Sequence, residues 1–129
     1  MENDIQYVAY LRVSTQKQGY SGLGVEAQQQ LIRNYLSGKI PIAEYIEVES
    51  GRKTDKGRPK LKEAYEYCRK HKGEVDLLLF LRWDRFARHV GFAFDYKEKF
   101  EALGVEINSL ESHIDFTGTE WATLLSLYC

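Results

Sequence analysis

Arginine is the residue type in this sequence with the clearest chemical potential. Polar clusters that contain it occupy residues 12–18, 58–59 and 84–88, and a further polar pair lies at residues 50–51. A guanidinium group binds phosphate oxygens with two parallel hydrogen bonds and compensates the charge that builds on them during reaction. The arginines in these clusters are Arg12, Arg58, Arg85 and Arg88. Chemistry at a phosphodiester is therefore the first hypothesis.

Ser14 is the candidate nucleophile, and Asp84 is the carboxylate that accompanies the arginines. A serine hydroxyl reacts slowly unless its proton is removed or its alkoxide is stabilised. The three histidines form no recognisable catalytic pair, so nearby arginines are the available means of activation. No cluster of histidines and cysteines has metal-binding spacing, and neither a metal nor a cofactor is expected. Taken singly, Ser14 could cap a helix, and Arg85 and Arg88 could form surface ion pairs.

Four apolar runs predict the strands that would position these groups, at residues 5–13, 42–48, 75–81 and 105–110. The first and third runs have few polar interruptions, which is typical of strands buried on both faces. Helices are predicted over residues 26–37, from residue 59 to about 72, over 93–103 and over 121–128. In the first helix, the expected apolar stripe consists of Ala27, Leu31, Tyr35 and Leu36.

Alternation of strands and helices predicts a three-layer α/β fold, with a predominantly parallel sheet of four to five strands flanked by helices. A turn at Asp84-Arg85 should follow the third strand. Because the carboxyl ends of parallel strands share one edge of a sheet, we expect the polar clusters to converge there. The length of 129 residues suits one domain.

Charge is unevenly distributed along the chain, although the net charge is only −1. Residues 51–88 contain twelve Lys or Arg and six Asp or Glu. The rest of the chain contains six Lys or Arg and thirteen Asp or Glu. Such segregation can create a basic surface that attracts phosphate, although it can also serve solubility alone. No signal peptide or membrane-length apolar stretch is present, so a cytoplasmic protein is expected. Cys68 lies on an apolar helical face and is predicted to be a buried free thiol.

Several segments together resemble the serine recombinases of the resolvase and invertase type. Residues 10–18, Tyr-Leu-Arg-Val-Ser-Thr-Gln-Lys-Gln, are similar to that family's strand-to-loop signature, and residues 22–28 are similar to its second glutamine segment. Ser50-Gly51, Arg58-Pro59 and the Asp-Arg-Phe-Ala-Arg run at residues 84–88 also match family motifs in order and spacing. The resemblance covers nearly the whole chain.

The resemblance implies site-specific DNA recombination through a 5′-phosphoserine intermediate on Ser14, with release of a 3′ hydroxyl and no metal or nucleotide cofactor. It places Arg12, Arg85 and Arg88 around the phosphate and Arg58 in the active site. It links Asp84 to the arginine network and to proton handling. The supporting polar positions that it implies are Gln18, Gln28 and Ser50.

The resemblance also implies that DNA is the partner, that the full-length protein forms a homodimer and a synaptic tetramer, and that a bacterium, phage or mobile element encodes it. Residues 1–129 are then expected to be the catalytic domain, ending within a C-terminal helix that begins near Gly118, with the DNA-recognition region outside this sequence. The apolar stripe of that helix could complete this domain's core or meet a partner. It consists of Trp121, Leu124, Leu125 and Tyr128.

Two other functions compete with recombination. One is a noncatalytic recombinase-like module that grips DNA or another subunit. The other is a metal-free phosphohydrolase or phosphotransferase that uses Ser14 on a small phosphate ester. The complete set of a serine, a carboxylate and four arginines favours intact chemistry over the first alternative, and a comparison of DNA with nucleotide esters would decide the second.

Overall fold

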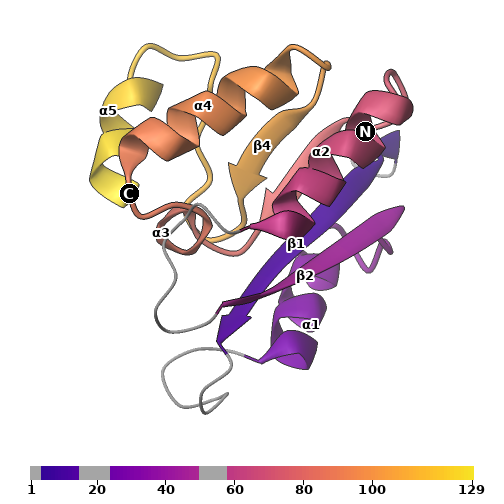
Figure 1. The fold of residues 1–129 in the computed structure, drawn as a ribbon. Coiled ribbons are helices and arrows are strands. Elements are labelled where there is room, and N and C mark those ends of the chain that lie inside the picture. The colour runs from indigo at the N-terminus through magenta and orange to yellow at the C-terminus, as the bar shows by residue number, and fades with distance from the viewer. Residues whose placement is uncertain (1–3, 15–23, 50–57) are drawn as a thin grey trace.

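The computed structural model describes residues 4–14, 24–49 and 58–129. Within these ranges it contains a four-stranded sheet, shown in Figure 1, in the order β2-β1-β3-β4. The strands are β1 (Tyr7–Ser14), β2 (Ala43–Glu49), β3 (Leu77–Phe80) and β4 (Glu106–Ser109). Each neighbouring pair is parallel. The predicted α/β fold with a parallel sheet is therefore confirmed.

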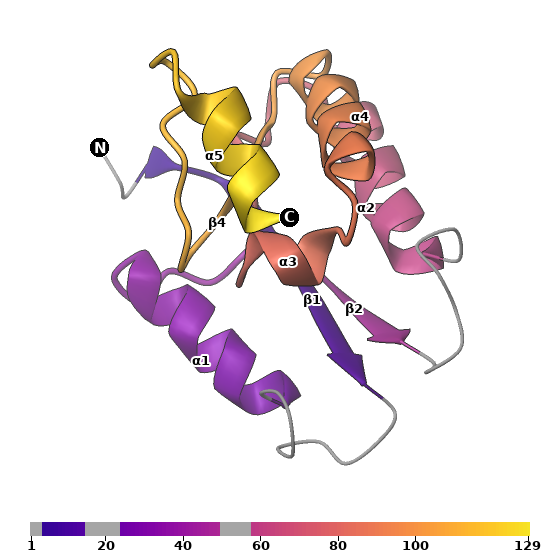
Figure 2. The same cartoon turned by 90° about the vertical axis from the view of Figure 1, so that its left-hand side faces the viewer.

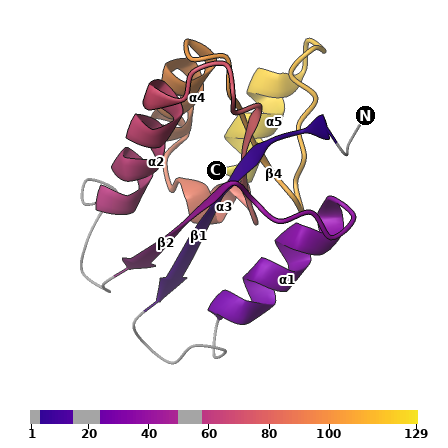
Figure 3. The same cartoon turned by 90° about the vertical axis from the view of Figure 1, so that its right-hand side faces the viewer.

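Helices cover both faces of the sheet. They are α1 (Val25–Tyr35), α2 (Pro59–Lys70), α3 (Trp83–Phe86), α4 (Val90–Glu101) and α5 (Trp121–Tyr128). Figures 2 and 3 show α1 on one side of the sheet and α2 and α4 on the opposite side, which gives the three predicted layers. No helix among the described residues is long and apolar enough to cross a membrane.

Alternation of side chains along β1 divides the interior into two cores. Val8 and Tyr10 belong to the larger core, beneath α2, α4 and α5, whereas Tyr7, Ala9 and Leu11 belong to the smaller core beneath α1. All five side chains are at most 1% exposed. The prediction that the first strand is buried on both faces is confirmed, and β1 is the rigid centre from which the site is built.

Three of the four residues predicted for the apolar stripe of the first helix are exposed, Ala27, Leu31 and Tyr35, while the fourth, Leu36, is buried as predicted. Gln28 and Ile32 are buried instead. The reason is that Gln28, a polar residue, faces the sheet and donates a hydrogen bond to a backbone carbonyl of β1. A pattern based on apolar residues alone cannot place a buried, hydrogen-bonded glutamine on the inner face.

Two other features refine the sequence predictions. The turn expected at residues 84–85 is the short helix α3, whose first residue, Trp83, is completely buried. The apolar stripe of α5 packs against the larger core, with Leu125 completely buried and Trp121 partly buried. Its use in completing this domain's core is therefore established, while Leu127 on the same helix is 73% exposed.

Cys68 is a buried free cysteine of α2, as predicted. Burial raises the pKa of its thiol from 9.0 to about 11. The unfolded thiol ionises at lower pH than the folded one. The buried, protonated thiol of Cys68 therefore contributes fully to the stability of the fold below pH 9, and this contribution is lost as the pH rises toward 11. We expect the free energy of unfolding to fall by roughly 2 kcal/mol more in the wild type than in Cys68→Ala over this interval. Urea titrations at both pH values would show parallel losses if the thiol were not responsible.

Candidate active site

The carboxyl ends of β1 and β3 form the centre of the candidate site. Strand order reverses between these two neighbours, since β2 lies on one side of β1 and β3 and β4 lie on the other. In open parallel sheets, such a reversal leaves a crevice where ligands bind. The starts of α1 and α2 and the whole of α3 lie at this same edge, as Figure 1 shows. Of the four predicted clusters, the described residues 12–14, 58–59 and 84–86 therefore lie at one edge, while residues 15–18 and 50–51 lie outside the described residues.

Arg12 of β1 is anchored to α3. Its side chain is 7% exposed, and Nη1 donates a hydrogen bond of 2.9 Å to the backbone carbonyl of Arg85. The carbonyl of Arg12 in turn accepts a hydrogen bond of 3.3 Å from Nε2 of Gln28, which is buried in α1. These contacts join β1, α1 and α3. A small recess at the junction is lined by Tyr10, Arg12, Gln28, Phe80, Leu81, Arg85 and Phe86.

Arg58 is the most deeply buried arginine of the site, with only 2% of its surface exposed. It immediately precedes Pro59, whose ring suits the first position of α2. Nη1 of Arg58 donates a hydrogen bond to the carbonyl of Phe86. The guanidinium carbon also lies 4.6 Å from the ring centroid of Phe92, close enough for a cation–π interaction. Arg12 and Arg58 thus donate hydrogen bonds to the consecutive backbone carbonyls of Arg85 and Phe86 at the end of α3.

The other charged groups in and beside α3 are more accessible. Asp84 is exposed and accepts two hydrogen bonds from Arg82, at 3.1 Å from Nε and 2.9 Å from Nη2. Arg85 is half-buried and Arg88 is exposed. Sequence reasoning gave no role to Arg82. Its position two residues before Asp84 was the available signal, but spacing could not show that the two side chains form a bidentate pair.

Ser14 is the last residue of β1, where it pairs in register with Glu49 of β2. The backbone bearing the proposed nucleophile therefore lies two residues beyond Arg12, at the edge to which Arg58 and Arg85 also belong. Two other predicted site residues, Gln18 and Ser50, lie outside the described residues.

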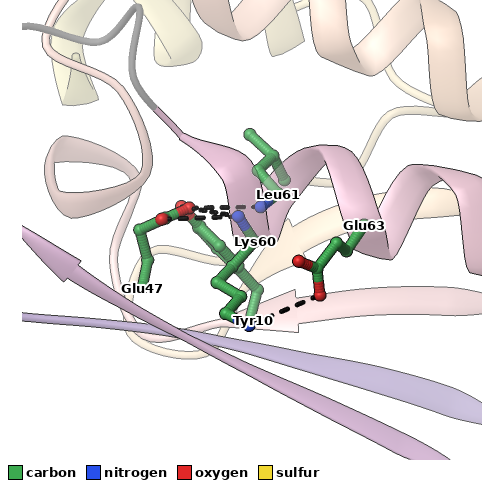
Figure 4. Close-up of polar contacts among 5 residues, drawn as sticks. All are labelled: Tyr10, Glu47, Lys60, Leu61 and Glu63. Atoms are coloured by element: carbon green, nitrogen blue, oxygen red, sulfur yellow. Dashed lines mark hydrogen bonds and ion pairs between the residues drawn. The ribbon is translucent and has the colours of Figure 1, made fainter.

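Sequence reasoning also missed Glu47, a buried carboxylate in β2. Oε1 of Glu47 accepts hydrogen bonds of 3.1 Å from the Tyr10 hydroxyl and from the backbone amides of Lys60 and Leu61 (Figure 4). Burial raises the pKa of Tyr10, the Arg58 charge opposes this rise, and the Glu47 charge adds to it. Glu47 is one of three glutamates in β2, with Glu44 and Glu49, so its residue type gave no signal that it is buried.

Among the residues that the structure describes, no group of three or more His, Cys, Asp or Glu side chains could hold a metal ion. The prominent charged side chains at this edge are instead guanidinium groups from β1, the start of α2 and α3. Such an arrangement can bind a phosphate group and stabilise negative charge developing on it.

Comparison with known proteins agrees with this geometry. A family model described as "Resolvase, N terminal domain" matches residues 7–127. The solved C-terminal catalytic domain of ISC1926 TnpA, an IS607-like serine recombinase, is similar at 27% identity and a TM-score of 0.65, covering 82% of this chain and 70% of that one. No curated protein sequence matches the chain.

Two further solved structures share the fold at lower sequence identity. The N-terminal catalytic domain of TP901-1 integrase is 23% identical, with a TM-score of 0.73 and coverage of 95% of this chain and 91% of that one. A resolvase family site-specific recombinase from Streptococcus pneumoniae is 20% identical, with a TM-score of 0.65 and coverage of 95% and 85%. The expected resolvase-like architecture is thus confirmed.

Proposed function

This chain belongs to the resolvase family, whose N-terminal domain model spans almost all of it, and from that premise we propose that Ser14 cleaves DNA by direct attack on a phosphodiester. The family supports a role in site-specific recombination, with DNA as the partner. The observation that carries the mechanism is the convergence of Arg12, Arg58 and Arg85 on the end of the strand that bears Ser14.

The proposed reaction conserves the phosphodiester as a protein–DNA ester. Ser14 Oγ loses its proton and bonds to the phosphorus, while the bond to the 3′ oxygen breaks and that oxygen leaves as a hydroxyl after taking up a proton. The 5′ phosphate remains on the serine. Attack by the 3′ hydroxyl of another strand reverses these steps, restoring the DNA and releasing Ser14. Since one ester replaces another at each step, no nucleotide cofactor is required.

Burial suggests a division of labour among the arginines. Arg12 and Arg58 are preorganised, because each has a donor committed to a backbone carbonyl of α3. Arg85 and Arg88 are more accessible and are proposed to meet a phosphate that arrives from solvent. Preorganised donors stabilise a transition state most effectively because they need not reorganise as charge develops. Gln18, Gln28 and Ser50 are proposed as supporting polar groups.

The assembled protein is proposed to be a homodimer that pairs with a second homodimer in a synaptic tetramer. Strand exchange requires four broken ends to be held at once, and one copy of this site cleaves one strand. Cross-linking in the presence and absence of DNA would test this assembly. Dimers alone under conditions that yield recombined DNA would contradict it.

Covalent capture tests the proposed function against both alternatives. The full-length protein is incubated with nicked duplexes of randomised sequence, in which a short fragment is lost after cleavage, and the mixture is run on a denaturing gel. A DNA-linked protein band is expected. DNA binding without the band supports a noncatalytic module. Hydrolysis of a nucleotide ester or p-nitrophenyl phosphate, without the band, supports a phosphohydrolase.

Asp84 is expected to act mainly by holding Arg82, and Asp84→Asn should lower the cleavage rate about tenfold. Both side chains are about half exposed, so the free energy of unfolding should change by less than about 1 kcal/mol. Glu66→Gln is the matched control, because Glu66 forms a similarly exposed 2.8 Å pair with Arg69 on α2. Equal cleavage rates in the two variants would show that the Asp84 charge has no part in the reaction.

A further inference from the structure

Glu47 is the buried acidic side chain nearest the start of α2, and its surroundings account for its burial. It is 4% exposed, and its carboxylate accepts hydrogen bonds from Tyr10, Lys60 and Leu61. The backbone amide nitrogen of Lys60 also lies 3.4 Å from the second carboxylate oxygen, Oε2. A carboxylate withdrawn from water is costly unless such donors replace the lost solvent. An apolar residue at this position of the strand would avoid the cost of desolvation that the Glu47 carboxylate carries.

The donors from Lys60 and Leu61 are amides in the first turn of α2, which have no acceptor within the helix. The residue before this helix commonly caps such amides with its own side chain. Here that residue is Arg58, and a guanidinium group carries donors only. Glu47 supplies the missing acceptor from the neighbouring strand. The Arg58 side chain can therefore extend toward α3, where it binds the carbonyl of Phe86.

Glu47 and Arg58 also act on the same hydroxyl. Burial raises the pKa of Tyr10 most, the charge of Arg58 opposes this rise, and the charge and hydrogen bond of Glu47 add to it. Tyr10 itself is 1% exposed, packs edge to face against Phe86 and donates to Glu47. A continuous set of contacts therefore runs from β2 through the start of α2 to the end of α3.

We propose that Glu47 is a positioning residue for DNA cleavage: by capping α2 from β2, it fixes the backbone of Arg58 so that the guanidinium is preorganised at the phosphate site. This inference rests on the proposed function. It differs from a general stabilising role, because the effect of Glu47 on cleavage must pass through Arg58.

The test compares Glu47→Gln with Glu63→Gln in the full-length protein. Glu63 lies in the same part of α2 but is about half exposed and pairs with Lys60 Nζ at 3.5 Å (Figure 4). Glu47→Gln keeps the side-chain shape, removes the charge and replaces one of the two acceptor oxygens with an amide NH2 that can only donate. We expect a shifted or broadened Arg58 guanidinium signal in ¹⁵N NMR and a fall of about ten- to a hundredfold in cleavage rate. Glu63→Gln should change neither quantity.

A double-mutant cycle separates positioning from simple stabilisation. In an Arg58→Lys background, the guanidinium that Glu47 positions is absent, so adding Glu47→Gln should lower cleavage by less than about threefold. An equal loss in both backgrounds would overturn the proposal. If Glu47→Gln does not fold, Glu47→Asp retains the charge but shortens its reach, and the same Arg58 shift is expected. An unchanged Arg58 signal in a folded Glu47 variant would also overturn it.

The NMR readout keeps this inference distinct from the proposed function. If the wild type forms no DNA adduct, the proposed reaction fails, but the Arg58 signal still decides whether Glu47 positions that side chain. If the wild type forms the adduct and Glu47→Gln does so at the same rate, only the inference about Glu47 fails.

Discussion

Replacing Ser14 with alanine is expected to abolish the covalent protein–DNA adduct, lowering the cleavage rate by about three orders of magnitude or more. The proposed reaction has no other group that can form the ester, so the loss should be nearly complete rather than graded. The measurement is a denaturing gel of the protein with nicked duplex DNA. Ser14→Ala should still bind that DNA within about twofold in a gel shift, because the phosphate-binding arginines are unchanged.

Retention of the adduct in Ser14→Ala would show that another residue is the nucleophile. Absence of an adduct in both proteins, on DNA that both bind, would favour a noncatalytic DNA-binding module. Loss of DNA binding together with the adduct would require a folding control, for which the far-UV circular dichroism of the two proteins is sufficient.

Arg58→Ala should have the second-largest effect, because it damages both the fold and the site. The variant leaves the carbonyl of Phe86 without this donor and removes the cation–π contact with Phe92. We expect the free energy of unfolding to fall by about 3 kcal/mol. The cleavage rate per folded molecule should fall by about a hundredfold or more, since a preorganised guanidinium is lost from the phosphate site. Urea unfolding and the adduct assay measure the two effects separately.

Arg69→Ala is the matched control for Arg58→Ala. Arg69 belongs to α2 as well, but it is about half exposed and pairs with Glu66 in solvent. Its replacement should cost less than about 1 kcal/mol and leave cleavage unchanged. If Arg58→Ala destabilised the protein but its folded fraction cleaved DNA at the wild-type rate, Arg58 would have a structural role only.

Sequence patterns were sufficient for the framework because each strand and helix has a strong local signature. The apolar run that becomes β1 could only be buried on both faces. Gly73 and Gly104, at φ values of +91° and +78°, lie in the turns that follow α2 and α4, which end at Lys70 and Glu101, about two residues before the predicted ends. Such signals are local. The first helix shows where they fail, since Gln28 is buried through a hydrogen bond to a residue sixteen positions away.

Convergence of the arginines could also be predicted, because parallel strands bring their carboxyl ends to one edge. The individual side-chain contacts could not be predicted from the sequence. Arg12 meets the carbonyl of Arg85 across 73 positions, and Glu47 meets the amides of α2 across a crossover connection. These pairings depend on how far each side chain reaches after the helices pack. Residue types and spacing therefore predicted a chemistry, while the contacts of Arg58 became visible only in three dimensions.

The helix α5 illustrates a choice that periodicity could not make. Its apolar stripe was equally suited to a partner or to this domain, and packing of Leu125 into the larger core shows that the stripe serves this domain. Figures 1 and 2 show the end of this helix beside α3. Burial raises the pKa of the Cys129 thiol at its terminus, and the charge of Asp84 adds to this rise. The last helix thus contacts α3, the element that carries Asp84 and Arg85.

Mapping the covalent bond is the most direct test of the proposed role of Ser14. The wild-type adduct is digested with nuclease and trypsin, and the peptide of residues 13–17 is analysed by fragmentation mass spectrometry. A nucleotide joined through phosphate to Ser14 is the expected result. A nucleotide on Thr15, on a tyrosine or on any other residue would contradict serine-mediated cleavage at the end of β1.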